Sequence, residues 1–292
     1  MPGSGPYPPW GSNIHFIHLP FVVLSSSVTC PLRAGRASRV CTISTFSTGR
    51  RGASREARVH LREPEQHPRV TPAELAHIRS DGDEDSTRVP WLPLLGHRQT
   101  WAFAMGKFFT DPVWWFYLFW SGKFFAERFG VSIKTIGAPL ITIYVLADIG
   151  SVAGGWFSSA LLKRGWTANA ARKLTMLLCA LCVLPVAYAP VTDNLWTAVL
   201  LISLAAAAHQ GFSANLFTLT SDLFPRRAVG SVVGIGGMAG ALGGILMQAA
   251  SGRIKESTGS YLTMFIIAGA VYFLGLTAIH LLAPRLERAK LA

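Results

Sequence analysis

The chain has 292 residues, of which 50% are apolar and only 14% are charged, and its mean hydropathy is +0.36. A soluble domain of this size carries about 25% charged residues. The deficit falls on long apolar stretches after residue 100, which alternate with short polar ones. Because a bilayer-spanning helix needs roughly 20 mostly apolar residues, this pattern predicts an all-α integral membrane protein.

The net charge of +12 raises nucleic acid as a possible partner. The basic residues, however, gather in an Arg-rich N-terminal stretch and in short clusters between apolar segments. A nucleic-acid binder presents a continuous basic face instead. The clusters are typical of the connections between membrane spans, so the lipid bilayer and not nucleic acid is the expected partner.

Residues 1–58 differ in kind from the rest, with seven arginines, no lysine and one acid. The apolar run Ile14–Leu24 is too short to span a bilayer, and it lacks the basic start of a secretion signal. The composition is similar to that of a transit peptide, a misassigned start or a translated non-coding stretch, and we favour the last two. We expect a disordered, non-native segment here.

Residues 59–99 are polar and are predicted to form a cytoplasmic loop region with one short helix at Thr71–Arg79. Thr71 and Glu74 have the spacing of a capping box, and Pro72 occupies the first helical position, where its missing N–H costs nothing. Residues 285–292 are expected to form a cytoplasmic tail.

Six transmembrane helices are predicted within residues 100–284. Prolines at 112 and 185 remove internal hydrogen bonds and predict bends. The expected spans are Thr100–Trp120, Gly137–Leu162, Leu174–Val191, Leu195–Phe217, Gly230–Ala250 and Tyr261–Leu282.

The connections between these spans predict their orientation. One set of connections carries nine Lys and Arg residues and the other carries five. Positively charged loops stay on the cytoplasmic side, so both termini are expected in the cytoplasm of a multi-pass protein of the inner (plasma) membrane.

Two spacings within the spans predict packing rather than chemistry. Gly236, Gly240 and Gly244 recur every four residues and let another helix approach closely, with a hinge as the alternative. Cys179 and Cys182 form a C-x-x-C without a second pair nearby, so they are interpreted as small buried apolar residues. Neither a disulfide nor a metal site is expected.

Charged residues within the first span need a reason, because each costs about 2.5–3.5 kcal/mol at mid-bilayer. Lys107 and Asp111 lie one turn apart on one helix face. They are either an internally neutralised pair, or a cation that meets an anionic substrate once Asp111 releases it. The aromatic run Trp114–Tyr117 could hold a sugar ring or anchor the helix at the bilayer interface.

Further polar residues interrupt the second and fourth spans. Asp148 has no basic residue within a turn, so it is either a functional acid or makes a structural hydrogen bond to a neighbouring helix; Tyr144 lies one turn before it. The fourth span carries a polar group that predicts either a cavity lining or interhelical packing. This group consists of His209, Gln210, Ser213 and Asn215. Gln210 and Ser213 share one helix face, whereas Asn215 lies on a different face.

The residues after position 58 contain no nucleophile–base arrangement, metal-ligand cluster or phosphate-binding glycine loop. The run Gly234–Gly237 does not follow a strand, so it fails the context test for nucleotide binding. We therefore expect neither an enzyme nor a cofactor, and no metal.

The loop after the second predicted span resembles the cytoplasmic signature loop of the major facilitator superfamily. That loop reads glycine, small residues, an aspartate and then basic residues. Here Ser159 or a neighbour stands at the aspartate position, which puts the loop's charge-locking role in doubt. The matching residues are Gly155, Lys163, Arg164, Gly165, Arg172 and Lys173.

Other segments resemble the hexuronate transporters of the anion:cation symporter group: KFFTDPVWWFY from Lys107, RFG from Arg128, HQGFSAN from His209 and SDLFPRRAV from Ser221. The resemblance covers residues 60–292. It implies the carboxyl-terminal half of a twelve-span transporter that moves a sugar acid with a proton, with a missing N-terminal half as partner. It also implies substrate contacts from Lys107, Gln210, Ser213, Asn215, Trp115 and Tyr144, with Asp111, Asp148 and His209 as polar or proton-linked groups.

A second function remains open from the sequence. The chain could be a non-transporting membrane scaffold or an inactive truncated gene product, because the acids and the arginine that the family uses in its first half are not encoded in residues 1–58. No alternating access is expected of one half alone, since that motion needs two halves.

Overall fold

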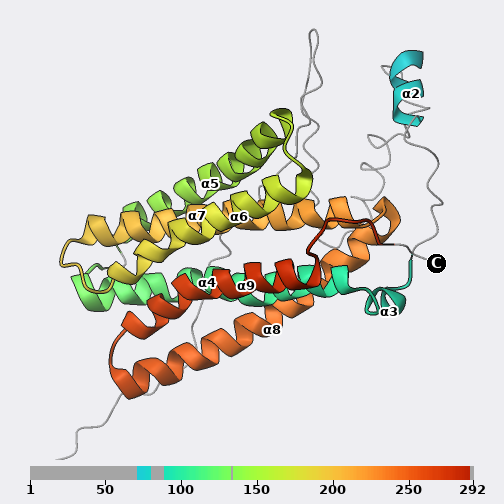
Figure 1. The fold of residues 1–292 in the computed structure, drawn as a ribbon. Helices are drawn as coiled ribbons and strands as arrows, with labels where there is room; N and C mark the ends of the chain where they lie inside the picture. Colours follow the sequence, from blue (N-terminus) through green and yellow to red (C-terminus); the bar gives the residue numbers. More distant parts are fainter. Residues whose placement is uncertain (1–70, 80–88, 133, 290–292) are drawn as a thin grey trace, which may run out of the picture.

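The computed structural model describes residues 71–79, 89–132 and 134–289, and the regular structure of these residues is entirely helical (Figure 1). The predictions for residues 1–58, and those for 59–70, 80–88 and 290–292, lie outside the described residues. Three short helices are α2 (Pro72–Arg79), α3 (Trp91–Leu94) and the 3₁₀ helix η2 (Leu184–Tyr188). The long helices are α4 (Arg98–Phe129), α5 (Gly137–Lys163), α6 (Ala168–Val183), α7 (Leu195–Leu223), α8 (Arg226–Thr258) and α9 (Leu262–Leu282).

Each predicted span corresponds to one long helix, but their apolar character is unequal. Five are long and apolar enough to cross a membrane by length and composition: α5, α6 continued by η2, α7, α8 and α9. The helix α4 is not among them, although it has 32 residues. Its polar residues Lys107 and Asp111 lower the hydropathy of its central part. The chain is thus an all-α membrane protein whose first predicted span carries the strongest polar interruption.

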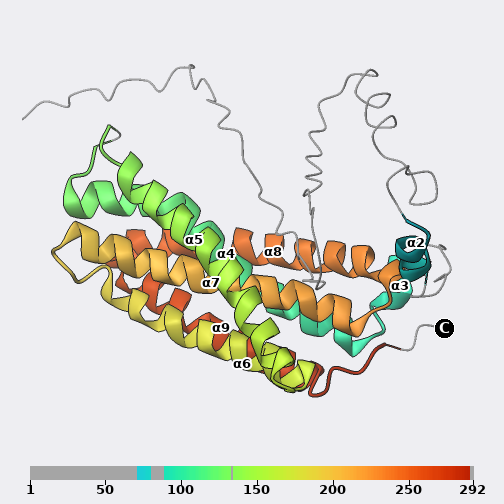
Figure 2. The ribbon, with the colours of Figure 1, turned by 90° about the horizontal axis from the view of Figure 1, so that it is seen from above.

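The helices pack in an exchanged arrangement that the chain order does not suggest. The first three long helices, α4–α6, are followed by a second set of three, α7–α9. In space α5 and α6 pack on α7, whereas α8 and α9 pack on α4, so the two sets exchange their first helices (Figures 1 and 2). Direct contact between α4 and α7 joins the two groups at the centre of the bundle.

Local sequence signals set where the helices begin and end. Thr71 and Glu74 form the predicted reciprocal cap of α2, with Thr71 N donating to Glu74 Oε2 at 2.9 Å and Glu74 N to Thr71 Oγ1 at 3.3 Å. At the end of α5, Gly165 has φ 88° and closes a Schellman turn, in which Trp166 N donates to Leu161 O at 3.2 Å. In the left-handed region glycine is the residue without a steric penalty.

The two prolines act differently. The α-helical bonding of α6 ends before Pro185 and the chain continues as η2, in line with the predicted bend. Pro112 stays inside α4. It has no N–H for the carbonyl of Phe108, and that carbonyl lies against Gly243 of α8, where a Cβ would collide with it.

The predicted glycine packing is confirmed, and a second glycine contact accompanies it. Gly236, Gly240 and Gly244 of α8 lie against side chains of α4. On the other side of the bundle Gly154 of α5 lies against Gly211 of α7, where a Cβ on Gly154 would be 2.5 Å from Gly211 Cα. Close approach of two helices therefore occurs twice, which is how membrane helices gain packing contacts without a hydrophobic driving force between them.

The prediction that both cysteines of the C-x-x-C are buried is wrong for one of them. Cys179 is half-buried and Cys182 is exposed, and both are free thiols. This part of α6 turns apolar residues such as Leu178 and Leu181 outward. In a membrane protein lipid covers such residues, so apolar character alone does not predict burial in the protein.

Candidate functional site

A buried ion pair lies where α4, α7 and α8 meet. Lys107 Nζ is 2.8 Å from Asp111 Oδ1, one turn along α4, and Lys107 is only 7% exposed. The ammonium also lies 4.5 Å from the centre of the Phe217 ring of α7, a cation–π contact. The carboxylate of Asp111 lies against Gly240 of α8, which has no side chain to displace it. Three helices therefore hold one cation and one anion out of the lipid.

An aromatic chain runs through four helices beside this pair. Tyr144 of α5 is 39% exposed and meets Trp114 of α4 edge-on, with ring centroids 6.2 Å apart. Trp114 stacks on His209 of α7 at 5.5 Å, and His209 Nδ1 lies 2.7 Å from Tyr272 Oη of α9. Both His209 and Tyr272 are buried. The chain therefore connects an exposed tyrosine to the interior of the bundle.

The sequence reasoning placed Tyr144 and His209 in the site but not Trp114 or Tyr272. Trp114 was visible only as one member of an aromatic run. Tyr272 carries a hydroxyl in the middle of a mostly apolar span, and a buried hydroxyl needs a hydrogen-bond partner, which was the signal available. Its partner lies 63 residues away in sequence and could be found only from the fold.

Asn215 lies in the contact between α7 and α5. Its Nδ2 donates to Gly154 O at 3.1 Å and to Gly211 O at 2.9 Å, and the residue is 1% exposed. Gln210 is half-buried and Ser213 is buried, and no hydrogen bond joins either side chain to a described residue. The structure thus gives Asn215 an interhelical contact and leaves the polar atoms of Gln210 and Ser213 without protein partners within the described part of the chain.

Two other predicted residues lie apart from this group. Asp148 is exposed on α5, and the described residues offer it no ion pair or hydrogen bond. Trp115 lies on the α8 side of α4, stacked on Phe119 at 5.9 Å and against Gly244. The structure therefore brings together Lys107, Asp111, Tyr144 and His209, but does not join Asp148 or Trp115 to them.

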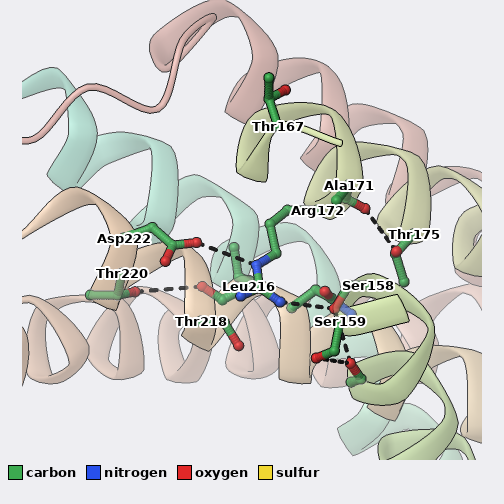
Figure 3. A network of polar contacts seen from close by, with 12 residues as sticks. Ser158, Ser159, Thr167, Ala171, Arg172, Thr175, Leu216, Thr218, Thr220 and Asp222 are labelled. Carbon is green, nitrogen blue, oxygen red and sulfur yellow. Dashed lines mark hydrogen bonds and ion pairs between the residues drawn. The ribbon is translucent and has the colours of Figure 1, made fainter. Parts of the chain in front are cut away.

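Arg172, from the predicted signature loop, is the centre of a second polar network (Figure 3). Its Nη1 donates to Ser158 Oγ at 2.8 Å and its Nε to Asp222 Oδ2 at 3.3 Å. Ser159, at the position where an aspartate was expected, donates to Gly155 O at 2.8 Å instead. Asp222 of α7 thus supplies the negative charge that the loop lacks, and Arg172 ties α5, α6 and α7 together.

The sequence reasoning quoted Asp222 within a motif but gave it no role. Its proximity to Arg172 depends on the packing of α6 against α7, which spacing along the chain does not encode. An acid in the last turn of an apolar helix, just before the Phe224–Pro225 stop, was the available signal.

The other basic residues of the signature loop have separate roles. Lys163 and Arg164 are exposed at the end of α5. Lys173 Nζ donates to the carbonyl oxygens of Ala283 at 2.7 Å and Pro284 at 2.8 Å. Carbonyls that follow a helix end lack helical partners, and a lysine satisfies them.

Comparison with known proteins identifies the fold family. The sequence profile of the Major Facilitator Superfamily matches residues 57–248. This chain belongs to the major facilitator superfamily.

Several members of the superfamily are similar in sequence. The hexuronate transporter of Escherichia coli (strain K12) is 26% identical over 219 residues, which cover 73% of this chain and 50% of that protein. The probable galactarate/D-glucarate transporter of Bacillus subtilis (strain 168) is 28% identical over 229 residues, covering 74% and 49%. The D-galactonate transporter of Escherichia coli O6:H1 is 27% identical over 243 residues, covering 76% and 55%. The chain spans about half the length of these relatives.

The superfamily architecture explains the exchanged packing. Each six-helix half of such a protein is built from two inverted repeats of three helices. Here α4 and α7 are the first helices of the two repeats. The helix α4 carries Lys107, Asp111 and Trp114. The helix α7 carries His209, Gln210 and Phe217. The site residues that the structure brings together therefore lie mainly on the two helices that meet at the centre of the bundle.

The described residues contain no group of three His, Cys, Asp or Glu side chains that could hold a metal ion. A surface hollow of about 350 Å³ lies between α6 and α9. A second, of about 200 Å³, lies around the end of α9. Neither is lined by a predicted substrate contact. The central arrangement consists of one cation paired with one carboxylate, next to aromatic faces and hydrogen-bonding side chains.

Proposed function

We propose that the chain forms one half of a pathway that moves a sugar-acid anion across the inner membrane together with a proton. The buried Lys107–Asp111 pair carries this proposal. Hexuronate, galactarate, D-glucarate and D-galactonate, which the names of the relatives give as their substrates, all carry carboxylates. A carboxylate of the substrate can take the place of the Asp111 carboxylate beside the Lys107 ammonium.

When the substrate carboxylate replaces Asp111 beside Lys107, the site stays electrically neutral only if a proton enters with the substrate. In the resting pair one positive and one negative charge cancel. When a sugar carboxylate binds Lys107, Asp111 becomes the uncompensated charge unless it takes up a proton. An isolated charge within the membrane is costly, so binding of the anion and protonation of Asp111 favour one another. Each bound carboxylate then brings one proton, which is the basis of symport.

Neighbouring side chains fit the rest of a sugar acid. Trp114 and Tyr144 offer aromatic faces, and Gln210 and Ser213 offer hydrogen-bonding groups without protein partners among the described residues. Trp115 and Asn215 would enter the site only after a rearrangement, since each now contacts a neighbouring helix. His209, stacked against Trp114, would fix the position of that ring.

We also propose that a second six-helix half completes the pathway, with both termini in the cytoplasm. The strongest support is Asp148, an exposed acid in the middle of an apolar helix. An acid that faced lipid would be costly, so this side of α5 suits a water-filled path or a protein partner. The half-length match to the relatives and the bias of basic residues between the two sets of connections agree with this arrangement.

Substrate binding to the purified chain tests the role of the ion pair. D-glucuronate binding, followed by tryptophan fluorescence, should strengthen as the pH is lowered. Lys107→Gln should weaken it about thirtyfold or more, since losing one partner of a buried charge pair costs about 2 kcal/mol or more. Asp111→Asn should bind with no pH dependence. Lys123→Gln, an exposed lysine on the same helix, is the control and should behave as the wild type.

Uptake of labelled glucuronate and galacturonate into proteoliposomes tests transport. The full-length parent protein should accumulate label when a proton gradient is imposed, and this chain alone should not. Absence of gradient-driven uptake by the intact parent would refute the transport proposal. Robust uptake by the chain alone would refute the requirement for a separate half and indicate that two copies pair.

A further inference from the structure

A groove between α6 and α9 has the layout of a phospholipid. Its volume is about 350 Å³, and the two helices that line it contact one another. Because α6 begins at the end of the bundle where α9 ends, their polar residues meet at that end, with Leu177 and Leu276 one turn deeper. The lining residues are Lys173, Leu174, Leu177, Leu276, Thr277 and His280.

The mouth of the groove is positively charged. Lys173 Nζ lies 3.5 Å from His280 Nδ1, and no acid lines the groove. Lys173 is held in place by its bonds to the carbonyls of Ala283 and Pro284, while His280 is exposed. Two nitrogen groups therefore lie together at the depth where an apolar helix gives way to its polar end.

The deeper part of the groove is apolar, and a contact between α9 and η2 closes it. Leu174 and Leu177 of α6 face Leu276 of α9, and Leu177 is 37% exposed. Further along, Gly269 of α9 lies beside Leu184, to which a Cβ on Gly269 would be in ordinary contact. The α9 helix is thus in contact with η2 just beyond the apolar part of the groove, which ends the groove there.

We propose that this groove binds an anionic phospholipid. One acyl chain lies along the three leucines and the headgroup phosphate lies against the Lys173 ammonium beside His280, with the Thr277 hydroxyl as a donor. A basic residue near an anionic membrane surface gains about 1 kcal/mol, which corresponds to about fivefold in affinity. The groove offers no acid to a choline group, so phosphatidylglycerol is preferred over phosphatidylcholine. The inference depends on the membrane location of the chain and not on the transport proposal.

Native mass spectrometry of the full chain tests this site. The protein is reconstituted in bilayers of equal parts phosphatidylcholine and phosphatidylglycerol, and the co-purifying lipids are counted. The wild type should retain phosphatidylglycerol in excess, and Lys173→Gln should reduce that excess about fivefold. Thr277→Trp, which fills the groove while keeping both basic residues, should also remove it. Arg288→Gln, an exposed cation of the same end of the bundle outside the groove, should retain the wild-type excess.

The outcomes separate a lipid from a simple anion. Glycerol phosphate without acyl chains should not raise the thermal stability of the wild type, whereas phosphatidylglycerol should. Equal retention of the two lipids by the wild type would overturn the proposal, as would an unchanged excess in both Lys173→Gln and Thr277→Trp. Stabilisation by glycerol phosphate to the same extent as by the lipid would also overturn it, because it would assign the basic mouth to a soluble anion.

Discussion

The contacts between α5 and α7 and between α4 and α8 are both built on glycine, but they differ in what the glycine meets. In the α5–α7 contact Gly150 lies against the backbone of Ala207, and Gly154 against the backbone of Gly211. In the α4–α8 contact the glycines of α8 lie mostly against side chains. Gly236 meets the Phe103 ring, Gly240 the Asp111 carboxylate and Gly244 the Trp115 indole.

This difference indicates which contact can adjust. Two backbones in direct contact have no side chain that can rotate out of the way, and an amide hydrogen bond from Asn215 adds to the α5–α7 contact. The α4–α8 contact contains groups that can move or titrate, such as the Trp120–Gln248 hydrogen bond of 2.6 Å and the Glu127–Lys255 ion pair of 2.9 Å. We therefore expect α5–α7 to be the fixed contact and α4–α8 the adjustable one.

Gly154→Ala should give the largest loss of stability. The new Cβ would be 2.5 Å from Gly211 Cα and 2.9 Å from Gly211 O, so the helices must separate. Overpacking of this kind costs up to about 3 kcal/mol, measured by thermal unfolding of the purified protein. Gly155→Ala is the matched control, because its Cβ would meet nothing within 4 Å. Equal unfolding temperatures for the two variants would contradict the fixed contact.

Gly240→Ala should cost less, about 1.5 kcal/mol, although its Cβ would also collide with its neighbour. The neighbour is the Asp111 carboxylate, which can rotate away at the expense of its bond to Lys107. The variant should therefore show altered pH dependence of glucuronate binding together with a modest fall in unfolding temperature. Gly237→Ala, where the added Cβ meets nothing, is the control. A loss as large as that of Gly154→Ala would show that the α4–α8 contact is equally rigid.

The sequence alone predicts the glycine face of the α4–α8 contact, but it does not predict the α5–α7 contact. The four-residue spacing of Gly236, Gly240 and Gly244 lies on a single helix, so it could be read directly. The α5–α7 contact pairs Gly154 with Gly211, and that pairing depends on which helices meet. Because the two repeats exchange their first helices, α5 packs mainly on α7 and meets its chain neighbour α4 only in weaker contacts such as Tyr144–Trp114.

The same limit applies to the candidate site. Lys107 and Asp111 were predicted as a pair because one turn of one helix separates them. The partners of His209 and Arg172, which are Tyr272 and Asp222, come from other helices and were missed. Hydropathy predicted six spans, yet it is weakest for α4, where the polar pair lies. Periodicity within a helix is thus readable from the sequence, whereas contacts between helices need the fold.

Asn215→Ala should have a smaller effect on the fixed contact, about 1 kcal/mol. It removes one hydrogen bond between helices, to Gly154 O of α5, and one within α7, to Gly211 O. Polar bonds between membrane helices average ~0.6 kcal/mol each. The carbonyls of Gly154 and Gly211 keep their bonds within their own helices, which limits the loss. Ser203→Ala is the control, since Ser203 is buried on the same helix but bonds only to Val199 O. If both variants lose the same stability, the hydrogen bond from Asn215 to Gly154 O of α5 adds nothing.

Glu127 should give the smallest effect, and it tests whether the α4–α8 contact responds to pH. The pKa of its carboxyl is lowered mainly by the hydrogen bond from Lys255, with further help from Tyr261 and from the positive charges of Lys255 and Lys123, against the opposing effect of burial. A lowered pKa in the folded state means that Glu127 stabilises the protein above the unfolded-state pKa. That contribution is lost as the pH falls through the folded-state value.

Because the Glu127 side chain is 39% exposed, solvent screening limits this contribution to a few tenths of a kcal/mol. Thermal unfolding of the wild type should therefore shift slightly downward on acidification, and Glu127→Gln should remove that part of the shift. Glu256→Gln, an exposed acid one residue after Lys255, should keep the wild-type slope. If Glu256→Gln, rather than Glu127→Gln, removed the fall of the unfolding temperature with pH, the pH response would be assigned to general surface charge. That result would then leave Asp111 as the titrating group through which the α4–α8 contact could respond to protons.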